Sequence, residues 1–213
     1  MLKLLFFRIK EYLLKIINIL FYKRKYTIQL FGKLPIYKDY ISFIKNQEAI
    51  EWREWLIDTF TKDICLPDAR WAFIYRSKSN SKILLGFISP SSDGSRLFPF
   101  SIFIAFKKDS IVYRNMNIPV FEIWERINSI WDELTCQEDV ESLLELHKTK
   151  NFTIDTFKLN STTIYERDLL IEKFIKDKTK NWPKILFFSD IKSKRYIIYD
   201  SEPDFFKQLA ENC

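Results

Sequence analysis

Few residues of this 213-residue chain carry side chains of the kind that catalysis or metal binding requires. The one histidine, His147, lies in LLELHKTK, where we expect an exposed residue near the end of a polar helix. Three cysteines, Cys65, Cys136 and Cys213, are far apart and odd in number, which favours a reducing, cytoplasmic compartment over a disulfide framework. A zinc site takes about four N, S or O ligands in a tetrahedron. The sequence therefore predicts no metal site.

Nucleotide chemistry has equally little support. A phosphate cradle needs clustered glycines, because its backbone N–H groups must approach the phosphate closely. The chain has three glycines, Gly32, Gly86 and Gly94, and neither GxGxxG nor GxxxxGKS/T occurs. We therefore expect no cofactor. An enzymatic or small-ligand alternative would use the carboxylates of Asp39 and Asp93 as acid and base in a shared pocket.

Two segments hold all three glycines and are the most informative part of the chain. One is FGKLPIYKDY at 31–40, which looks like a strand running into a loop marked by Gly and Pro. The other is GFISPSSDGSRLFPF at 86–100, a polar loop between two apolar strands. Asp93 suits an Asx turn or a pair with Arg96. Turn chemistry alone also accounts for these residue types, so a plain hairpin loop and a recognition loop both stay open.

Residues 1–25 carry the net charge of +6: seven of the 34 basic and one of the 28 acidic residues lie there, which leaves 27 of each sign elsewhere. The segment predicts a basic amphipathic helix that binds a membrane surface, a partner groove or its own domain. Basic residues interrupt it too often for a membrane span or a signal peptide. The interruptions are at positions 8, 10 and 15, and the basic residues expected to contact a membrane or partner are Lys3, Arg8, Lys10, Lys15, Lys23, Arg24 and Lys25.

The remaining residues, 26–213, are charge-balanced and rich in aromatic side chains. A neutral body lacks the basic surface with which proteins bind a phosphate backbone, so we expect no nucleic acid partner. The 36 aromatic residues (20 Phe, 10 Tyr, 6 Trp) exclude a disordered chain. With no repeat or linker visible, we expect one domain over 26–213.

Hydrophobic periodicity predicts the strands and helices that would position these two loops. Several strand candidates are apolar on both sides and need covers on both faces, which helices supply. The pattern predicts an α/β fold, a three-layer α/β/α sandwich with a mixed, partly antiparallel sheet. Strands are expected at 26–31, 71–76, 82–88, 97–106, 152–157, 184–189 and 194–200, and helices at 47–62, 120–134, 139–148, 164–178 and 203–210.

The two glycine-bearing segments, in this order and spacing, resemble the TagF (ImpM) family of type VI secretion-associated proteins. The family pattern GKLP-x-x-GD-[FY] is matched by Gly32–Pro35 with Asp39-Tyr40, and G-x-x-x-PS-x-D-x-x-GR-x-FP by 86–99. Looser matches occur at 70–73 and 203–206. Lys38 replaces the usual glycine, Gly94-Ser95-Arg96 rearranges the usual Gly-Arg, and the leading helix lies outside the pattern.

The resemblance covers roughly residues 28–210 and implies a three-layer α/β/α fold and a non-enzymatic, post-translational regulator. Such a regulator restrains type VI assembly or firing, typically through a forkhead-associated scaffold protein. We expect the two loops to form or rigidify a docking surface. Lys33, Asp39, Asp93 and Arg96 would supply polar specificity, while Leu34, Phe98 and the prolines shape the backbone. The expected partner-binding residues are Gly32, Lys33, Leu34, Pro35, Asp39, Pro90, Ser91, Asp93, Arg96, Phe98 and Pro99.

Overall fold

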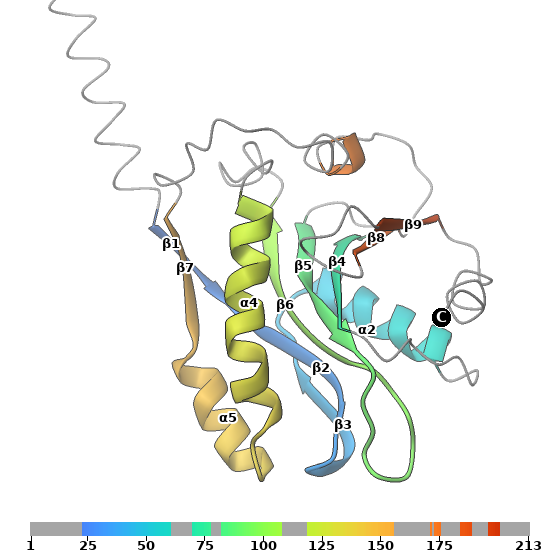
Figure 1. Cartoon of the computed structure of the whole chain (residues 1–213), viewed down its shortest axis with the longest axis vertical. Helices are drawn as coiled ribbons and strands as arrows, with labels where there is room; N and C mark the ends of the chain where they lie inside the picture. Colours follow the sequence, from blue (N-terminus) through green and yellow to red (C-terminus); the bar gives the residue numbers. More distant parts are fainter. Residues whose placement is uncertain are drawn as a thin grey trace, which may run out of the picture.

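The computed structural model describes residues 23–60, 70–77, 82–107, 119–155, 171, 173–175, 184–188 and 196–200. Its described strands form a seven-stranded sheet in the order β3-β2-β6-β5-β4-β8-β9 and a two-stranded ribbon of β1 and β7 (Figure 1). The strands of the large sheet are β2 (Gln29–Leu34), β3 (Tyr37–Phe43), β4 (Trp71–Arg76), β5 (Lys82–Ser89), β6 (Phe100–Lys107), β8 (Lys184–Phe188) and β9 (Tyr196–Asp200).

Every neighbouring pair of described strands in the large sheet is antiparallel. The expectation of a mixed sheet is therefore wrong for these strands. Continuous apolar runs suggested parallel strands buried on both faces. Here the same runs belong to antiparallel strands whose two faces are both covered, so burial on both faces, not strand direction, explains the composition.

Strand residues alternate between two apolar clusters, one on each face of the sheet. On β4, Phe73 and Tyr75 belong to the cluster that contains helix α2 (Gln47–Phe60), whereas Ala72 and Ile74 belong to the cluster that contains helix α4 (Pro119–Thr135). Side chains of a strand point alternately to opposite faces, so this division follows from the pleat. Figure 1 accordingly shows α4 in front of the sheet and α2 behind it.

Both helices use periodic tryptophans to reach the sheet. On α2, the indole of Trp52 is fully buried and stacks on Phe73 with ring centroids 4.3 Å apart. On α4, Trp124 is fully buried against Phe188, at 5.0 Å between centroids. Spacings of three and four residues place such side chains on one helix face. The predicted helix 120–134 is confirmed to within one residue at each end, and the predicted helix 47–62 is confirmed over its described residues, 47–60.

Helix α5 (Val140–Thr149) follows α4 and leads into strand β7 (Asn151–Asp155). Its N-cap is Asp139, whose carboxylate accepts a hydrogen bond from the Ser142 amide at 2.7 Å. An N-cap carboxylate satisfies an amide that has no partner inside the helix. Strand β7 then pairs antiparallel with β1 (Lys23–Thr27).

Three local expectations need correction. Lys23, Arg24 and Lys25 lie in strand β1, not in a leading helix, because each pairs with β7 between Thr153 and Asp155. Residues 37–40, expected as part of a loop, belong to strand β3, since the Pro35-Ile36 turn folds the chain back onto β2. Strand 97–106 begins later, at Phe100.

Some predictions lie outside the described residues. The part of the leading helix at 1–22 is one of them, together with its basic residues Lys3, Arg8, Lys10 and Lys15. The helix at 203–210 is another. Of the helix expected at 164–178, the described residues Ile171 and 173–175 are helical. The strand expected at 26–31 is divided, because Tyr26 and Thr27 belong to β1 whereas Gln29 begins β2, and these two strands lie in different sheets. The described parts of the other predicted strands and helices agree with prediction apart from shifts at their ends.

Candidate functional site

The two loops meet around the ammonium group of Lys33. Gly32 pairs with Ile41 and Leu34 with Tyr37, so three residues of β3 stand opposite Lys33 alone, and the strand bulges. Lys33 is 1% exposed. Its Nζ donates to the carboxylate of Asp93 at 2.5 Å and to the backbone carbonyl of Lys38, in the bulge, at 3.4 Å. The bulge thus makes room for a buried cation.

Asp93 supplies the negative charge and also fixes the conformation of its own loop. Its Oδ1 accepts hydrogen bonds from the Ser95 amide, the Ser95 hydroxyl and the Arg96 amide at 3.0, 2.9 and 2.7 Å. Its Oδ2 accepts from Lys33 and from Arg96 Nη2, the latter at 3.2 Å. The Lys33 hydrogen bond, helped by the Ser95 and Arg96 amides and opposed by burial, holds the pKa of Asp93 well below its usual range.

Arg96 closes these contacts into a ring. Its Nη2 also donates to the carbonyl of Lys38, at 3.0 Å. Lys33 and Arg96 therefore share two acceptors, the Lys38 carbonyl and the Asp93 carboxylate, and the four hydrogen bonds form a closed cycle. We call these four residues the paired-loop ring. It joins segments about 60 residues apart in the chain, and polar networks of this kind hold a single arrangement when every member is satisfied.

Aromatic side chains line the apolar side of the paired-loop ring. Lys33 Nζ lies 4.6 Å from the centroid of the Tyr40 ring, a cation–π contact. Tyr40 stacks on Phe31 at 5.5 Å and meets Phe98 edge-on at 4.8 Å. Phe98 is 4% exposed and contacts Phe60 of α2. The ring is therefore anchored to the α2 face of the core.

Glycine is required where the loop after β5 returns against β2. Gly32 has φ +140°, and a Cβ there would lie 2.1 Å from the carbonyl oxygen of Pro99. Gly94 has φ +87°, but a Cβ at this position would meet no atom within 4 Å. Positive φ values favour glycine. Gly32 thus serves close backbone packing as well as conformation, and Gly94 serves conformation alone.

The expected partner-binding residues divide into a buried and an exposed set. The buried residues shape the loops from inside: Gly32, Lys33, Leu34, Asp93, Phe98 and Pro99. The residues with exposed or half-buried surface are Pro35, Asp39, Pro90, Ser91 and Arg96. The expectation that Lys33 and Asp93 present polar groups to a partner is wrong, because each is buried and bonded to the other.

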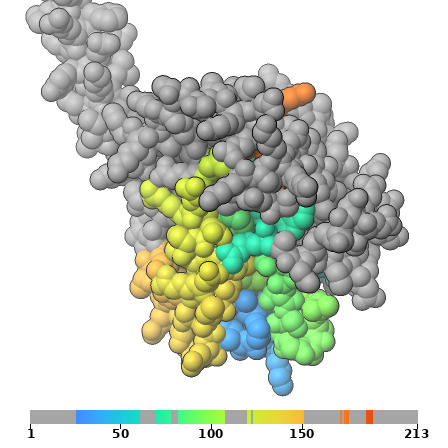
Figure 2. Space-filling model, in the orientation of Figure 1, coloured from blue at the N-terminus to red at the C-terminus, as the bar shows by residue number. Residues whose placement is uncertain are grey.

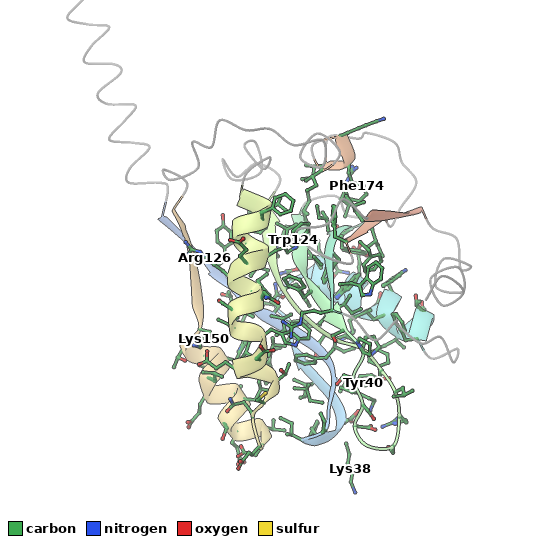
Figure 3. The ribbon with its side chains drawn as sticks, viewed as in Figure 1. Lys38, Tyr40, Trp124, Arg126, Lys150 and Phe174 are labelled. Atoms are coloured by element: carbon green, nitrogen blue, oxygen red, sulfur yellow. The ribbon has the colours of Figure 1, made fainter. Side chains whose placement is uncertain are left out.

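Sequence reasoning passed over the residues that stand out most on these loops. Leu97 is 72% exposed and Tyr37 is 45% exposed. Figure 2 shows their two segments side by side at the lower end of the molecule, blue for the β2–β3 hairpin and green for the loop after β5. In Figure 3 the side chain of Lys38 extends away from this end, whereas Tyr40 lies between β3 and the loop. In the sequence, Tyr37 lies next to Lys38 and Leu97 lies next to Arg96, and an apolar residue beside a charged one in a turn could have indicated this exposure.

His147 also departs from expectation. It is 7% exposed, its Nε2 lies 2.7 Å from the carbonyl oxygen of Ile28, and its ring packs on Phe43 at 4.8 Å. Burial lowers the pKa of His147, with Lys45 adding to this and the Ile28 carbonyl opposing it. A neutral ring donating from Nε2 fits this site. The residue docks α5 onto the start of β2 instead of facing water.

Groups of three or more His, Cys, Asp or Glu side chains placed to hold a metal ion are absent from the described part of the chain. None of the helices in the described ranges combines the length and the hydropathy needed to cross a membrane.

Comparison with known proteins gives a likeness in fold. No protein-family model matches the chain, and no curated protein matches it. Among solved structures, the chain is similar to the crystal structure of PA0076 from Pseudomonas aeruginosa PAO1, with a TM-score of 0.54 and 15% sequence identity. The match covers 86% of this chain and 93% of that one. The shared feature is therefore an arrangement of helices and strands over nearly the whole length of PA0076.

Proposed function

We propose that this chain is a non-enzymatic accessory protein of a bacterial type VI secretion system, a regulator that acts by binding other proteins. The resemblance of 31–40 and 86–100 to the TagF (ImpM) signatures suggests the pathway. The expected partners are type VI components, a forkhead-associated scaffold protein among them, and the expected effect is restraint of assembly or firing. We also propose the three-layer α/β/α architecture for the domain, supported by helices on both faces of the sheet.

The observation that carries the proposal is the paired-loop ring. Lys33 and Asp93 belong to two separate signature segments, and their side chains bond to each other in the interior. The signatures thus make physical sense as one unit that holds two loops in a fixed shape. A rigid loop pair with an exposed outer surface suits recognition, because little conformational entropy is lost on binding.

The enzymatic alternative would have Asp39 and Asp93 act together on a substrate. Asp93 has its two oxygens occupied by five hydrogen bonds, and its depressed pKa is unsuited to proton transfer near neutral pH. Asp39 is exposed, and its Oδ1 accepts a hydrogen bond from the Tyr40 amide at 2.8 Å. These contacts favour a structural role for both carboxylates.

A membrane tether through residues 1–25 is the second alternative, and it would make a cytoplasmic protein peripheral to the inner membrane. Its basis is the concentration of positive charge in that segment. Deleting residues 1–22 leaves β1 intact and separates the two ideas. Loss of membrane association with unchanged partner recovery would assign tethering to the leading segment and recognition to the body.

The direct test is affinity purification of the tagged full-length chain from its own bacterium, followed by identification of bound proteins. We expect type VI secretion components to be enriched over a tagged unrelated protein of similar charge. Deleting the gene should change the amount of a type VI effector released into the medium. Absence of secretion components from the bound fraction, together with unchanged effector release, would remove the pathway assignment.

A further inference from the structure

Two large apolar side chains stand in solvent on the loops that the paired-loop ring joins. Leu97 is 72% exposed although its neighbour Phe98 is buried, and Tyr37 is 45% exposed at the start of β3. Single exposed apolar residues are ordinary. These two are next in sequence to Arg96 and Lys38, which hydrogen-bond to each other through Nη2 and the backbone carbonyl. We call Tyr37, Lys38, Arg96 and Leu97 the loop tip.

The loop tip is held in place by local contacts as well as by the ring. Leu97 forms an antiparallel bridge with Ser92, and the Phe98 amide donates to the Ser91 carbonyl at 2.9 Å. The Asp93 amide donates to the Arg96 carbonyl at 3.3 Å. The backbone of Leu97 is therefore held in a closed turn, and this turn directs the side chain into solvent.

The charge of the tip favours an acidic ligand. Lys38 is exposed, and the Arg96 side chain is 61% exposed. Asp93 pairs with Arg96, but it is buried and its single negative charge is shared with Lys33. Asp39 follows Lys38 in the sequence and is exposed, so the exposed charged residues of the two loops are two cations and one carboxylate.

Arg96 is also prepared to bind a carboxylate. Among the described residues, both hydrogen bonds of its side chain come from Nη2, to Asp93 and to the Lys38 carbonyl. A guanidinium group has five N–H donors, so those of Nη1 and Nε are left for a ligand. A guanidinium already fixed on one side binds a carboxylate with little further loss of freedom.

We propose that the loop tip docks a short acidic segment of a partner protein, one in which an apolar side chain sits beside carboxylates. The apolar side chain packs on Leu97 and Tyr37, and the carboxylates bind Arg96 and Lys38. This inference rests on the proposed function, because it names the surface and the chemistry of that recognition. Helices α4 and α5 would repel the same segment, since 119–150 contains eight acidic and three basic residues.

Photo-crosslinking in the native bacterium tests the placement of the partner. Leu97 is replaced by p-benzoylphenylalanine in the full-length chain, and a matched chain carries the same group in place of exposed Lys148 on α5. We expect position 97 to capture a protein segment rich in Asp and Glu with an adjacent apolar residue, identified by mass spectrometry. Capture of a second copy of this chain, of lipid, of a non-acidic segment, or no capture above position 148 would overturn the inference.

The captured segment, made as a labelled peptide, tests the residues by fluorescence anisotropy. Leu97→Asp should weaken its binding about tenfold or more, as expected for a central contact. Lys38→Glu should weaken it by a smaller factor that shrinks as salt is added. Lys148→Glu, the matched charge reversal, should change the affinity less than about twofold. Equal affinities for all four proteins would overturn the inference, and thermal unfolding midpoints establish that the variants are folded.

The two proposals fail separately. If secretion components co-purify with the wild-type chain and equally well with Leu97→Asp, the pathway stands and the loop tip is not the docking surface. If the tip captures an acidic segment from a protein outside type VI secretion, the docking chemistry stands and the pathway assignment falls.

Discussion

The ion pairs Lys33–Asp93 and Arg70–Asp132 both join residues about 60 positions apart, at 2.5 and 2.8 Å. Their surroundings differ greatly. The side chains of the first pair are 1% and 0% exposed, and those of the second are 29% and 78% exposed. Arg70 also donates to Asn128 and lies over the Trp131 ring at 4.7 Å, on the surface of α4.

The difference shows where a charge constrains the fold. A buried charge that loses its partner keeps its desolvation cost, whereas an exposed one regains water. Lys33 and Asp93 therefore fix the two loops in one arrangement. Arg70 and Asp132 add an exposed ion pair to a contact with α4 that Arg70 already makes through the Trp131 ring. Substitutions at and around the two pairs test this contrast, beginning with the largest expected effect.

Replacing Lys33 by Met should have the largest effect, because it leaves the Asp93 carboxylate buried without its main partner. We expect the free energy of unfolding to fall by about 3 kcal/mol, measured by urea denaturation. Lys38→Met, a matched change at an exposed neighbour, should stay within about 0.5 kcal/mol of wild type. Adding Asp93→Asn to Lys33→Met should restore part of the loss. Equal effects at positions 33 and 38 would mean that the buried pair does not constrain the loops.

Gly32→Ala should be next, since the new Cβ would press on the Pro99 carbonyl and sit at an unfavourable φ. We expect a loss of about 2–3 kcal/mol in the free energy of unfolding. Gly94→Ala has the φ penalty without the contact and should cost about 1 kcal/mol. If the two variants unfold at the same denaturant concentration, the close approach of β2 to Pro99 is not a constraint.

His147 adds a dependence on pH that surface charges would not produce. Burial holds its pKa below the ordinary value of 6.5, so the unfolded chain binds a proton where the folded chain does not. Stability from this residue is complete above about pH 6.5 and declines as the pH falls toward the folded-state pKa. His147→Gln keeps a donor for the Ile28 carbonyl and should flatten the profile between pH 6.5 and 4.

Below about pH 4 a second decline should appear in wild type and in His147→Gln alike. Asp93 has a folded-state pKa below its ordinary value of 3.8, so its stabilisation is present above that pH and is lost on further acidification. Urea denaturation at several pH values measures both regions. An unchanged slope between pH 6.5 and 4 in the glutamine variant would contradict the assignment to His147.

Asp132→Ala should have the smallest effect. The residue is exposed, and Arg70 keeps its contacts with Asn128 and Trp131. We expect a change within about 0.5 kcal/mol that disappears in high salt. A loss comparable to that of Lys33→Met would remove the distinction between the two pairs.

Hydrophobic periodicity predicted most elements because it reports directly which faces are buried. The spacing of Trp52 and Trp55 predicts helix α2, and the spacing of Ile123 and Ile127 predicts helix α4. Strand β3 was not predicted, because its first residues Tyr37, Lys38 and Asp39 are polar or exposed. An edge strand beside a bulge shows little of the apolar alternation by which strands are recognised in a sequence. The direction of the strands was predicted wrongly for a different reason. A continuous apolar run indicates that a strand is buried on both faces, but it does not indicate whether the neighbouring strands run parallel or antiparallel to it.

The candidate site was predicted as a set of residues but not as an arrangement. Turn chemistry and the family resemblance singled out Lys33, Asp93 and Arg96. Which of them faces solvent depends on the bulge in β3 and on how the loop after β5 folds over it. The same limit explains His147, whose burial follows from the docking of α5 onto residues more than 100 positions away.

By itself the sequence determined the alternation of helices and strands, the charge-balanced body with its basic leading segment, and the two loops where glycine and proline gather. Local spacing and composition carry that information. Tertiary structure decided that the strands run antiparallel, that Lys33 and Asp93 neutralise each other inside, and that Tyr37 and Leu97 remain outside. Those outcomes depend on contacts between distant segments, where desolvation and the available partners determine whether a charged or apolar side chain is buried.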